Sequence, residues 1–173
     1  MSYILGIDPG ITGAYVILSK KKKYIKVCKL FGSFQEVLED LKPFLGNIEA
    51  CVEKVASSPQ QGVKSVATFL ENAGAWKGML IALEIPFTMV PPQTWQRKVL
   101  DTQAPKTPLA GLEDKQIRKT AAANRKLRKM HIVSFVLRKM PKSKKYFNLV
   151  KDQDKADAMC IALFKRQEMG YVD

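Results

Sequence analysis

Histidine and cysteine are scarce in this chain, and their scarcity excludes two classes of site. His131 is the single histidine, which excludes a histidine-rich zinc site and argues against Ser-His or Cys-His catalysis. The three cysteines, Cys28, Cys51 and Cys160, stand apart in apolar surroundings and form no CxxC pair. Unpaired buried thiols are typical of proteins in a reducing compartment.

Long apolar runs are missing as well. No stretch approaches the roughly 20 apolar residues that a membrane-spanning helix needs. The first residues follow the pattern of a buried strand, with no basic segment ahead of it. We therefore expect neither a signal peptide nor a membrane association. With 173 residues and 46% hydrophobic content, the chain can still bury a sizeable core.

The hydrophobic pattern predicts one α/β domain over residues 1–173, without internal repeats. We expect strands at residues 3–8, 13–19, 24–30, 50–55 and 85–90. We expect helices at residues 33–44, 63–83, 94–100, 114–130, 132–140 and 152–163, with a flexible loop at 101–111. Ser33, with Glu36 three residues later, is the expected N-cap of the first helix.

Acidic residues are few compared with basic ones. Sixteen Asp and Glu stand against 29 Lys and Arg, which gives a net charge of +13. Twelve Lys or Arg and a single Asp lie between Asp114 and Lys145, so this segment carries +11 of that charge. A solvated helical face would also be charged, but so one-sided an excess favours contact with nucleic acid. We therefore expect a basic helical segment at about 112–148, inserted before the last helix, that binds DNA. The expected location is the cytoplasm, a host cell's included, or another reducing compartment that contains DNA, such as an organelle.

Four carboxylates lie at the ends of predicted elements. Asp8 closes the first strand, just before a Pro-Gly turn, and Glu53 lies near the end of the fourth strand. Asp154 and Asp157 are three residues apart and so share one face of the last helix, in its first turn. Each carboxylate alone has an ordinary explanation as a turn former or as a charge that favours a helix N-terminus.

The last helix is expected to bring these carboxylates together. Its acidic face continues with Ala158 and Ile161, which should be buried, so the helix should pack across the ends of neighbouring strands. Four bare carboxylates would repel one another, and oxygen-only ligands favour Mg²⁺ or Mn²⁺ over zinc. Two such ions about 3.5–4 Å apart would clamp a scissile phosphate. A basic protein with an acidic metal pocket therefore suggests phosphodiester cleavage.

The residues around these carboxylates resemble a known family, the RuvC-type Holliday junction resolvases of the ribonuclease H-like superfamily. The similarity extends from residue 4 to about 164 and rests on Gly6-Ile7-Asp8-Pro9-Gly10 with Thr12-Gly13, on Val52-Glu53, and on Asp154-x-x-Asp157-Ala158-x-x-Ile161-Ala162. A further motif is similar to the bacteriophage and chloroplast resolvases, namely Val90-Pro91-Pro92-x-x-Trp95-x-Arg97. The segment 101–148 matches no pattern of the family, and the loop after Glu53 lacks an aromatic residue that could wedge into a base step.

The resemblance implies a mixed five-stranded ribonuclease H-like sheet flanked by helices. It also implies a homodimer that uses Mg²⁺ to make paired, symmetric nicks in a four-way DNA junction. In that case Asp8, Glu53, Asp154 and Asp157 are both the catalytic residues and the metal ligands.

Cationic residues near the expected pocket and along the basic segment are candidate DNA contacts. They are Lys54, Lys64, Arg97, Lys98, Lys115, Arg118, Lys119, Arg125, Lys126, Arg128 and Lys129. Trp95 is expected to anchor the core, with phosphate contact by its helix as the alternative. The helix at 63–83 is the candidate dimer interface because Gly74, Ala75 and Gly78 would allow close approach. The alternative is that this helix packs only on its own sheet.

Other functions are compatible with parts of this pattern. A structure-independent or branched-DNA nuclease of the same fold would share the four carboxylates. A non-catalytic DNA-binding module would explain the charge but not the convergent acids. An actin-like ATPase also begins with an acidic residue on a glycine-containing hairpin, but we find neither its second phosphate loop nor its adenosine site in the sequence.

Overall fold

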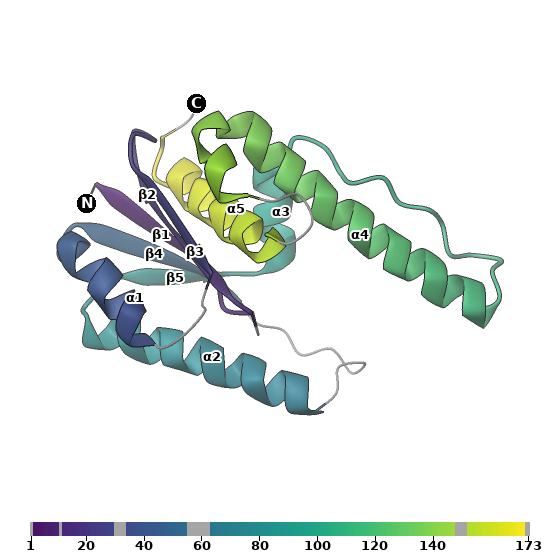
Figure 1. Ribbon diagram of the computed structural model, residues 1–173, viewed down its shortest axis with the longest axis horizontal. Coiled ribbons are helices and arrows are strands. Elements are labelled where there is room, and N and C mark those ends of the chain that lie inside the picture. Colours follow the sequence, from purple (N-terminus) through teal and green to yellow (C-terminus); the bar gives the residue numbers. More distant parts are fainter. Residues whose placement is uncertain (1, 11, 30–33, 55–62, 148–151, 172–173) are drawn as a thin grey trace.

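The computed structural model describes residues 2–10, 12–29, 34–54, 63–147 and 152–171. Its centre is a mixed five-stranded sheet in the order β3-β2-β1-β4-β5 (Figure 1). The central strand β1 pairs antiparallel with β2 and parallel with β4, and β5 continues the parallel side. The strands are β1 Tyr3–Asp8, β2 Ala14–Ser19, β3 Ile25–Lys29, β4 Ile48–Glu53 and β5 Phe87–Val90. This is the predicted mixed sheet.

Helices cover both faces of the sheet (Figure 1). The first face carries α1 Phe34–Leu41, the short 3₁₀ turn η1 Lys42–Phe44, and α2 Val63–Ala82. The second face carries α3 Pro92–Val99, α4 Asp114–Lys139, the 3₁₀ turn η2 Pro141–Tyr146, and α5 Gln153–Glu168. The expected N-cap Ser33 lies outside the described residues. None of the described helices is long and apolar enough to span a lipid bilayer.

The strands bury side chains on both faces, as expected for strands between two helical layers. Leu5 and Ile7 pack toward α1 and α2, where the fully buried Trp76 fills the core. Ile4, one residue earlier, packs toward α5. Because side chains alternate along a strand, Asp8 shares the face of Ile4 and points to the α5 layer.

Helix α5 approaches β1 very closely at Gly6. A Cβ atom at this position would lie 2.2 Å from the carbonyl oxygen of Ala158 and 2.6 Å from the backbone nitrogen of Ala162. Backbone atoms cannot move aside as a flexible side chain can. Only glycine at position 6 therefore allows the backbone of α5 to pack this closely against β1. This close packing determines the position of the first turn of α5 relative to the sheet.

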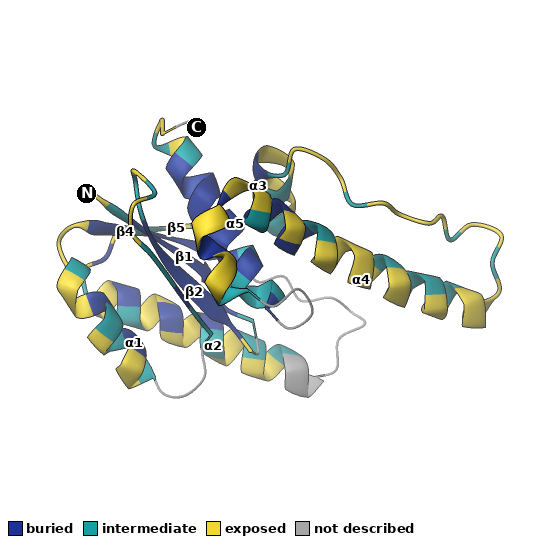
Figure 2. Ribbon diagram, turned by 45° about the horizontal axis from the view of Figure 1, so that its top comes forward, coloured by how far each residue is buried: buried dark blue, intermediate teal, exposed yellow. Residues whose placement is uncertain are grey.

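The two basic helices predicted at 114–130 and 132–140 are one continuous helix, α4, so that prediction was wrong. The sequence contains no proline or glycine between Asp114 and Lys139 that would break it. The burial of α4 changes near residue 131. The buried residues of the helix all follow this point, and they are Ile132, Val133, Phe135 and Val136. The earlier part projects beyond the sheet together with the preceding segment (Figures 1 and 2). We call residues 101–131 the arm.

Candidate active site

The parallel pairing of β1 and β4 places two carboxylates side by side. Ile7 pairs with Val52, and the next residue on each strand is Asp8 and Glu53 respectively. Both follow the alternation that faces α5, since Ile4 and Cys51 pack in that layer. The two side chains therefore lie at the same level on the same face of the sheet.

The first turns of α5 add two more carboxylates to this end of the sheet. Burial raises the pKa of Asp8 well above its usual range, and the negative charges of Glu53, Asp157 and Asp154 raise it further. Like charges have this effect only when they are close. The structure thus brings together all four acids that the sequence analysis selected.

A hydrogen-bond donor orients each of the four carboxylates. The Gly10 amide donates to Asp8 Oδ1 at 3.0 Å, and the Trp95 indole nitrogen donates to Glu53 Oε1 at 3.3 Å. The Thr12 hydroxyl donates to Asp154 Oδ2. Gln153 Nε2 donates to Asp157 Oδ2 at 3.1 Å. Within the described residues, each carboxylate thus accepts a hydrogen bond on one oxygen only, which leaves the other oxygen for a ligand.

Asp157 has one carboxylate oxygen whose hydrogen-bonding capacity is not satisfied. Its Oδ1 atom is buried and has no hydrogen-bond partner among the described residues. Burial raises its pKa to about 8, and Glu53 and Asp154 contribute to the rise while Arg128 opposes it. A buried carboxylate oxygen without a partner is costly unless a cation or a donor reaches it.

The carboxylates do not form a ready-made metal cage. Within the described ranges, no three Asp, Glu, His or Cys side chains are placed to hold one metal ion. The four acids are instead coupled electrostatically, as their effects on the pKa of Asp8 indicate.

A fifth carboxylate at the start of α5, Asp152, does not belong to this cluster. Its Oδ1 lies 3.3 Å from Lys29 Nζ and 3.1 Å from Lys155 Nζ. Two ammonium groups therefore balance its charge, which marks Asp152 as a structural contact between β3 and the start of α5.

Three of the predicted DNA-contacting residues line one groove, between α3 and α4. They are Arg97 on α3 and Arg125 and Arg128 on α4. Arg128 lies near enough to the acids to lower the pKa of both Glu53 and Asp157, although burial keeps both values raised. The groove therefore adjoins the carboxylate cluster.

The remaining predicted cations are spread over the molecule. Lys98 faces the other end of α5, where its Nζ lies 2.8 Å from Glu168 Oε1. Lys54 follows Glu53 directly and is exposed. Lys64 lies in the first turn of α2, whose side chains at 63–65 are outside the described part of the chain. The others occupy exposed positions of α4, at Lys115, Arg118, Lys119, Lys126 and Lys129.

Trp95 connects the core to the site. It is fully buried, in agreement with its expected role as a core anchor, and its indole nitrogen also reaches Glu53. The sequence pattern around Trp95 predicts a core residue, or a phosphate contact as the alternative, but gives no sign of this link to a carboxylate.

Two amide side chains that support the site were also missed. Asn72 Nδ2 on α2 donates to the carbonyl oxygen of Gly10 at 3.2 Å and so holds the turn after Asp8. Asn72 lies one helical turn before the buried Trp76, so a polar residue within the buried stripe of α2 was the available signal. Gln153, the partner of Asp157, gave no comparable signal.

The fold is similar to that of solved resolvase structures. RuvC of Thermus thermophilus in complex with a Holliday junction substrate matches with a TM-score of 0.57 and 18% identity, over 99% of this chain and 98% of that chain. Thermus thermophilus RuvC in a second structure matches with a TM-score of 0.52 and 16% identity, over 98% and 97% of the two chains. The Fowlpox virus resolvase with Holliday junction DNA has a TM-score of 0.40 and 16% identity, over 96% and 98%. No protein-family model and no curated protein sequence matches the chain. The fold is therefore RuvC-like, of the ribonuclease H type.

Proposed function

We propose that this chain is a divalent-cation-dependent endonuclease that resolves four-way DNA junctions by paired, symmetric nicks. The observation that carries the proposal is the convergence of Asp8, Glu53, Asp154 and Asp157 beside a cationic arm. The similar fold of Thermus thermophilus RuvC, solved with a Holliday junction substrate, supports the choice of DNA substrate.

The four carboxylates fit Mg²⁺, with Mn²⁺ as a substitute, by the chemistry of their donors. All are hard oxygen ligands, and the unpartnered Oδ1 of Asp157 is a buried acceptor that a cation would satisfy. Asp8, Glu53, Asp154 and Asp157 would hold the metal. When bound, it would supply Lewis acidity for attack of water on the scissile phosphate and for departure of the 3′ oxygen.

The chain's own residues prepare this chemistry by orientation and charge. Trp95 and Gln153 fix Glu53 and Asp157, so their free oxygens keep a defined direction. Residues that orient metal ligands in this way are commonly needed for full affinity. Arg128 brings positive charge next to the acids, where the phosphate of the cleaved strand would enter.

We further propose that the active species is a homodimer that pairs through α2. Resolution needs two cuts, and two-fold symmetry would place two identical sites on the junction. The outer face of α2 supports this interface, since Leu70 and Ile81 are 54% and 67% exposed. Around Gly74 and Gly78 on the same helix, an added Cβ would meet no atom within 4 Å.

The motif from Val90 to Arg97 supports a resolvase of the bacteriophage and chloroplast type. In this structure the motif places Trp95 against Glu53, so it contributes directly to the carboxylate cluster. We also propose that residues 1–173 act as one nuclease domain, with the basic segment at about 112–148 as an insertion that binds DNA.

The deciding experiment incubates the purified protein with labelled four-way, three-way and linear DNA, in Mg²⁺, in Mn²⁺ and in EDTA. We expect paired nicks at symmetry-related positions of the four-way junction in either metal, and no cleavage in EDTA. Equal cutting of linear DNA would indicate a structure-independent nuclease instead. Binding without cleavage in either metal would indicate a non-catalytic DNA-binding module.

A further inference from the structure

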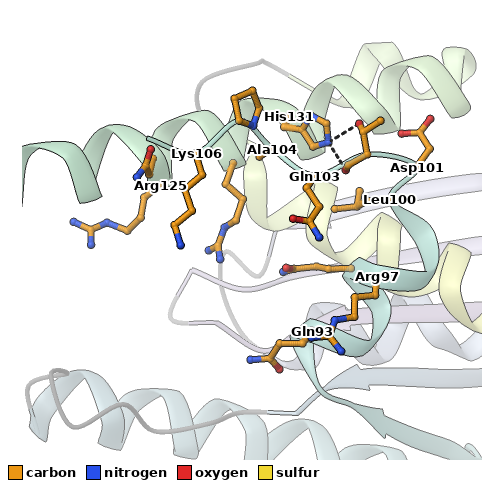
Figure 3. Close-up of a pocket in the computed structure, with 14 residues that line it drawn as sticks. Gln93, Arg97, Leu100, Asp101, Gln103, Ala104, Lys106, Arg125 and His131 are labelled. Atoms are coloured by element: carbon orange, nitrogen blue, oxygen red, sulfur yellow. Dashed lines mark hydrogen bonds between the residues drawn. The ribbon is translucent and has the colours of Figure 1, made fainter. Parts of the chain in front are cut away.

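A groove of about 640 Å³ lies between α3, α4 and the extended segment 101–107, which we call the strap. Figure 3 shows Gln93 and Arg97 extending from α3 on one side of this groove, and Lys106 and Arg125 extending from the strap and α4 on the other. Cavities of about 300–1,000 Å³ are large enough to enclose most of a small ligand. The groove can therefore take a nucleotide unit of a DNA strand.

Three side chains of α4 form hydrogen bonds with the strap and hold it in place as one wall of the groove. Asn124 pairs with the backbone of Thr107 through two hydrogen bonds of 2.9 Å, and His131 Nε2 donates to the carbonyl oxygen of Thr102 at 2.9 Å. Arg138 donates to both carboxylate oxygens of Asp101, at 2.9 and 2.8 Å. The three residues of α4 are seven positions apart, which is about two helical turns, so they share one face.

The charge of the groove favours phosphate. Arg97, Lys106, Arg125 and Arg128 line it, and its single acidic residue, Asp101, is neutralised by Arg138. Trp95, on the same helix as Gln93 and Arg97, donates to Glu53 Oε1 at 3.3 Å, so the groove lies next to the carboxylate cluster. A strand whose scissile phosphate lies at the cluster would therefore continue along this groove.

Three glutamines in the groove carry side-chain amides, which are hydrogen-bond donors and acceptors that phosphate binding does not require. Gln93 and Gln96 come from α3, three residues apart, and Gln103 comes from the strap. Their amides make no hydrogen bond to any described residue, in contrast to the amide of Asn124. A glutamine amide offers a donor and an acceptor that match N7 and N6 of adenine. Among the described residues no Phe, Tyr or Trp lines the groove, which favours reading of base edges over stacking.

We propose that Gln93, Gln96 and Gln103 read base edges of the DNA next to the scissile phosphate and so set the sequence at which the chain cuts, with adenine as the favoured base. The inference rests on the proposed nuclease function. In this arrangement the arginines of the groove hold the backbone of the strand, and the glutamines select its register.

The test uses four-way junctions with randomised bases around the crossover, cleaved in Mg²⁺ and sequenced at the cuts. The wild-type chain should cut a subset that contains adenine at a fixed distance from the nick. In a variant with Gln93→Ala, Gln96→Ala and Gln103→Ala, cutting of favoured sequences should fall about 5- to 150-fold per base read, the range for one bidentate contact. Disfavoured sequences should be cut as before.

Gln35→Ala is the matched control, because Gln35 is an exposed glutamine on α1, on the other face of the sheet. It should keep the wild-type distribution of cuts. Arg125→Ala should instead weaken cutting of all sequences about equally, as expected for a phosphate contact.

A binding selection on the same library separates this inference from the proposed function. It is run without metal, with the wild-type chain and with the triple glutamine variant. Sequence enrichment by the wild type that disappears in the variant supports the inference, even if no junction is ever cleaved. A wild-type chain without sequence bias, or a triple variant with the wild-type bias, would overturn it while leaving cleavage intact.

Discussion

At the scale of single residues, the cluster combines four acids whose charges oppose one another. Asp8 sits at its centre, since Glu53, Asp157 and Asp154 all raise its pKa, in addition to the effect of burial. Asp8 is therefore the residue with which we first test the cluster.

We predict that Asp8→Asn abolishes junction cleavage but preserves binding. Asparagine keeps the size of the side chain and an acceptor for the Gly10 amide, while it removes one negative charge from the cluster. Loss of that charge should leave affinity for DNA equal or higher. Cleavage and gel-shift assays in the same buffer check this, and cleavage at the wild-type rate would refute the assignment of Asp8.

A second charged group, far from the cluster, holds α1 on the sheet. Asp40 accepts hydrogen bonds from Lys26 of β3 and from the Tyr15 hydroxyl of β2, the latter at 2.6 Å. Burial alone would raise the pKa of Asp40, but these two hydrogen bonds outweigh it and lower the pKa below 3.8. The folded state thus favours the ionised carboxylate.

This shift predicts a pH-dependent loss of stability in Asp40→Asn. A carboxyl group with a lowered pKa stabilises the fold above its unfolded pKa, and that stability is lost as the pH falls through the folded value. At pH 7 the variant should lose about 1 kcal/mol of unfolding free energy, a modest value because the Lys26 pair is partly exposed. Melting curves should show the difference from wild type shrink as the pH falls below the ordinary pKa of an Asp side chain. A difference that stays constant over this fall in pH would contradict the prediction.

At the scale of elements, the contact between α5 and β1 sets the geometry of the site. Asp154 and Asp157 reach the strand ends because the backbone of α5 rests on Gly6. We predict that Gly6→Ala lowers the unfolding free energy by about 3 kcal/mol and impairs cleavage. The methyl group would collide with the backbone at Ala158, which no change of side chain relieves.

Chemical denaturation measures this effect, and Ser134→Ala is its control. Ser134 is an exposed residue of α4. That substitution should change the unfolding free energy by no more than about 0.5 kcal/mol, because surface substitutions seldom do more. If Gly6→Ala unfolded at the same denaturant concentration as the wild type, the close packing of α5 against Gly6 would be disproved.

Helix α4 provides the second element-scale prediction. Its exposed cations should neutralise DNA phosphates, so binding should weaken steeply with salt, with a log-log slope of about −0.9 per contact. Replacing Arg125, Lys126, Arg128 and Lys129 with alanine should make the slope less negative by up to about 3.6. Lys42→Ala, on η1 at the other face of the sheet, should leave it unchanged. An unchanged slope in the fourfold variant would make this part of α4 a solvated face only.

At the scale of the whole molecule, the proposed junction resolution requires a second active site for the second cut. In the proposed function, one carboxylate cluster would cut one strand at a time, whereas resolution of a junction requires two cuts. The exposed face of α2 lies on the side of the sheet away from α5, so two chains could pair through it and leave both clusters free (Figure 1).

We predict that Leu70→Arg with Ile81→Arg converts a dimer into a monomer and replaces paired nicks with single ones. Each arginine would place a charge in the centre of the apolar interface, where it could not be hydrated. Light scattering gives the mass, and a junction labelled on all four strands gives the cut positions. Leu45→Arg, at a leucine that is 40% exposed and lies outside α2, should change neither. Paired nicks by a stable monomer would contradict the proposed assembly.

The sequence alone determined the sheet, most of its helices and the choice of the four acids. These features are local, because strand and helix periodicities and a carboxylate at the end of an element can be seen within a few residues. The sequence predicts a break near residue 131, where the exposed part of α4 gives way to a buried one, although no proline or glycine interrupts the helix.

Only the tertiary structure decided what lies beside the acids. The hydrogen bond from Trp95 to Glu53 joins residues 42 positions apart, and that from Asn72 to Gly10 joins residues 62 apart. The strap groove likewise depends on contacts between Asp101 and Arg138, 37 positions apart. Such contacts arise from the packing of whole elements, and the pattern within one element does not encode which distant residue it will meet. The sequence therefore selected the four acids as candidates, and the tertiary structure determined which residues contact them.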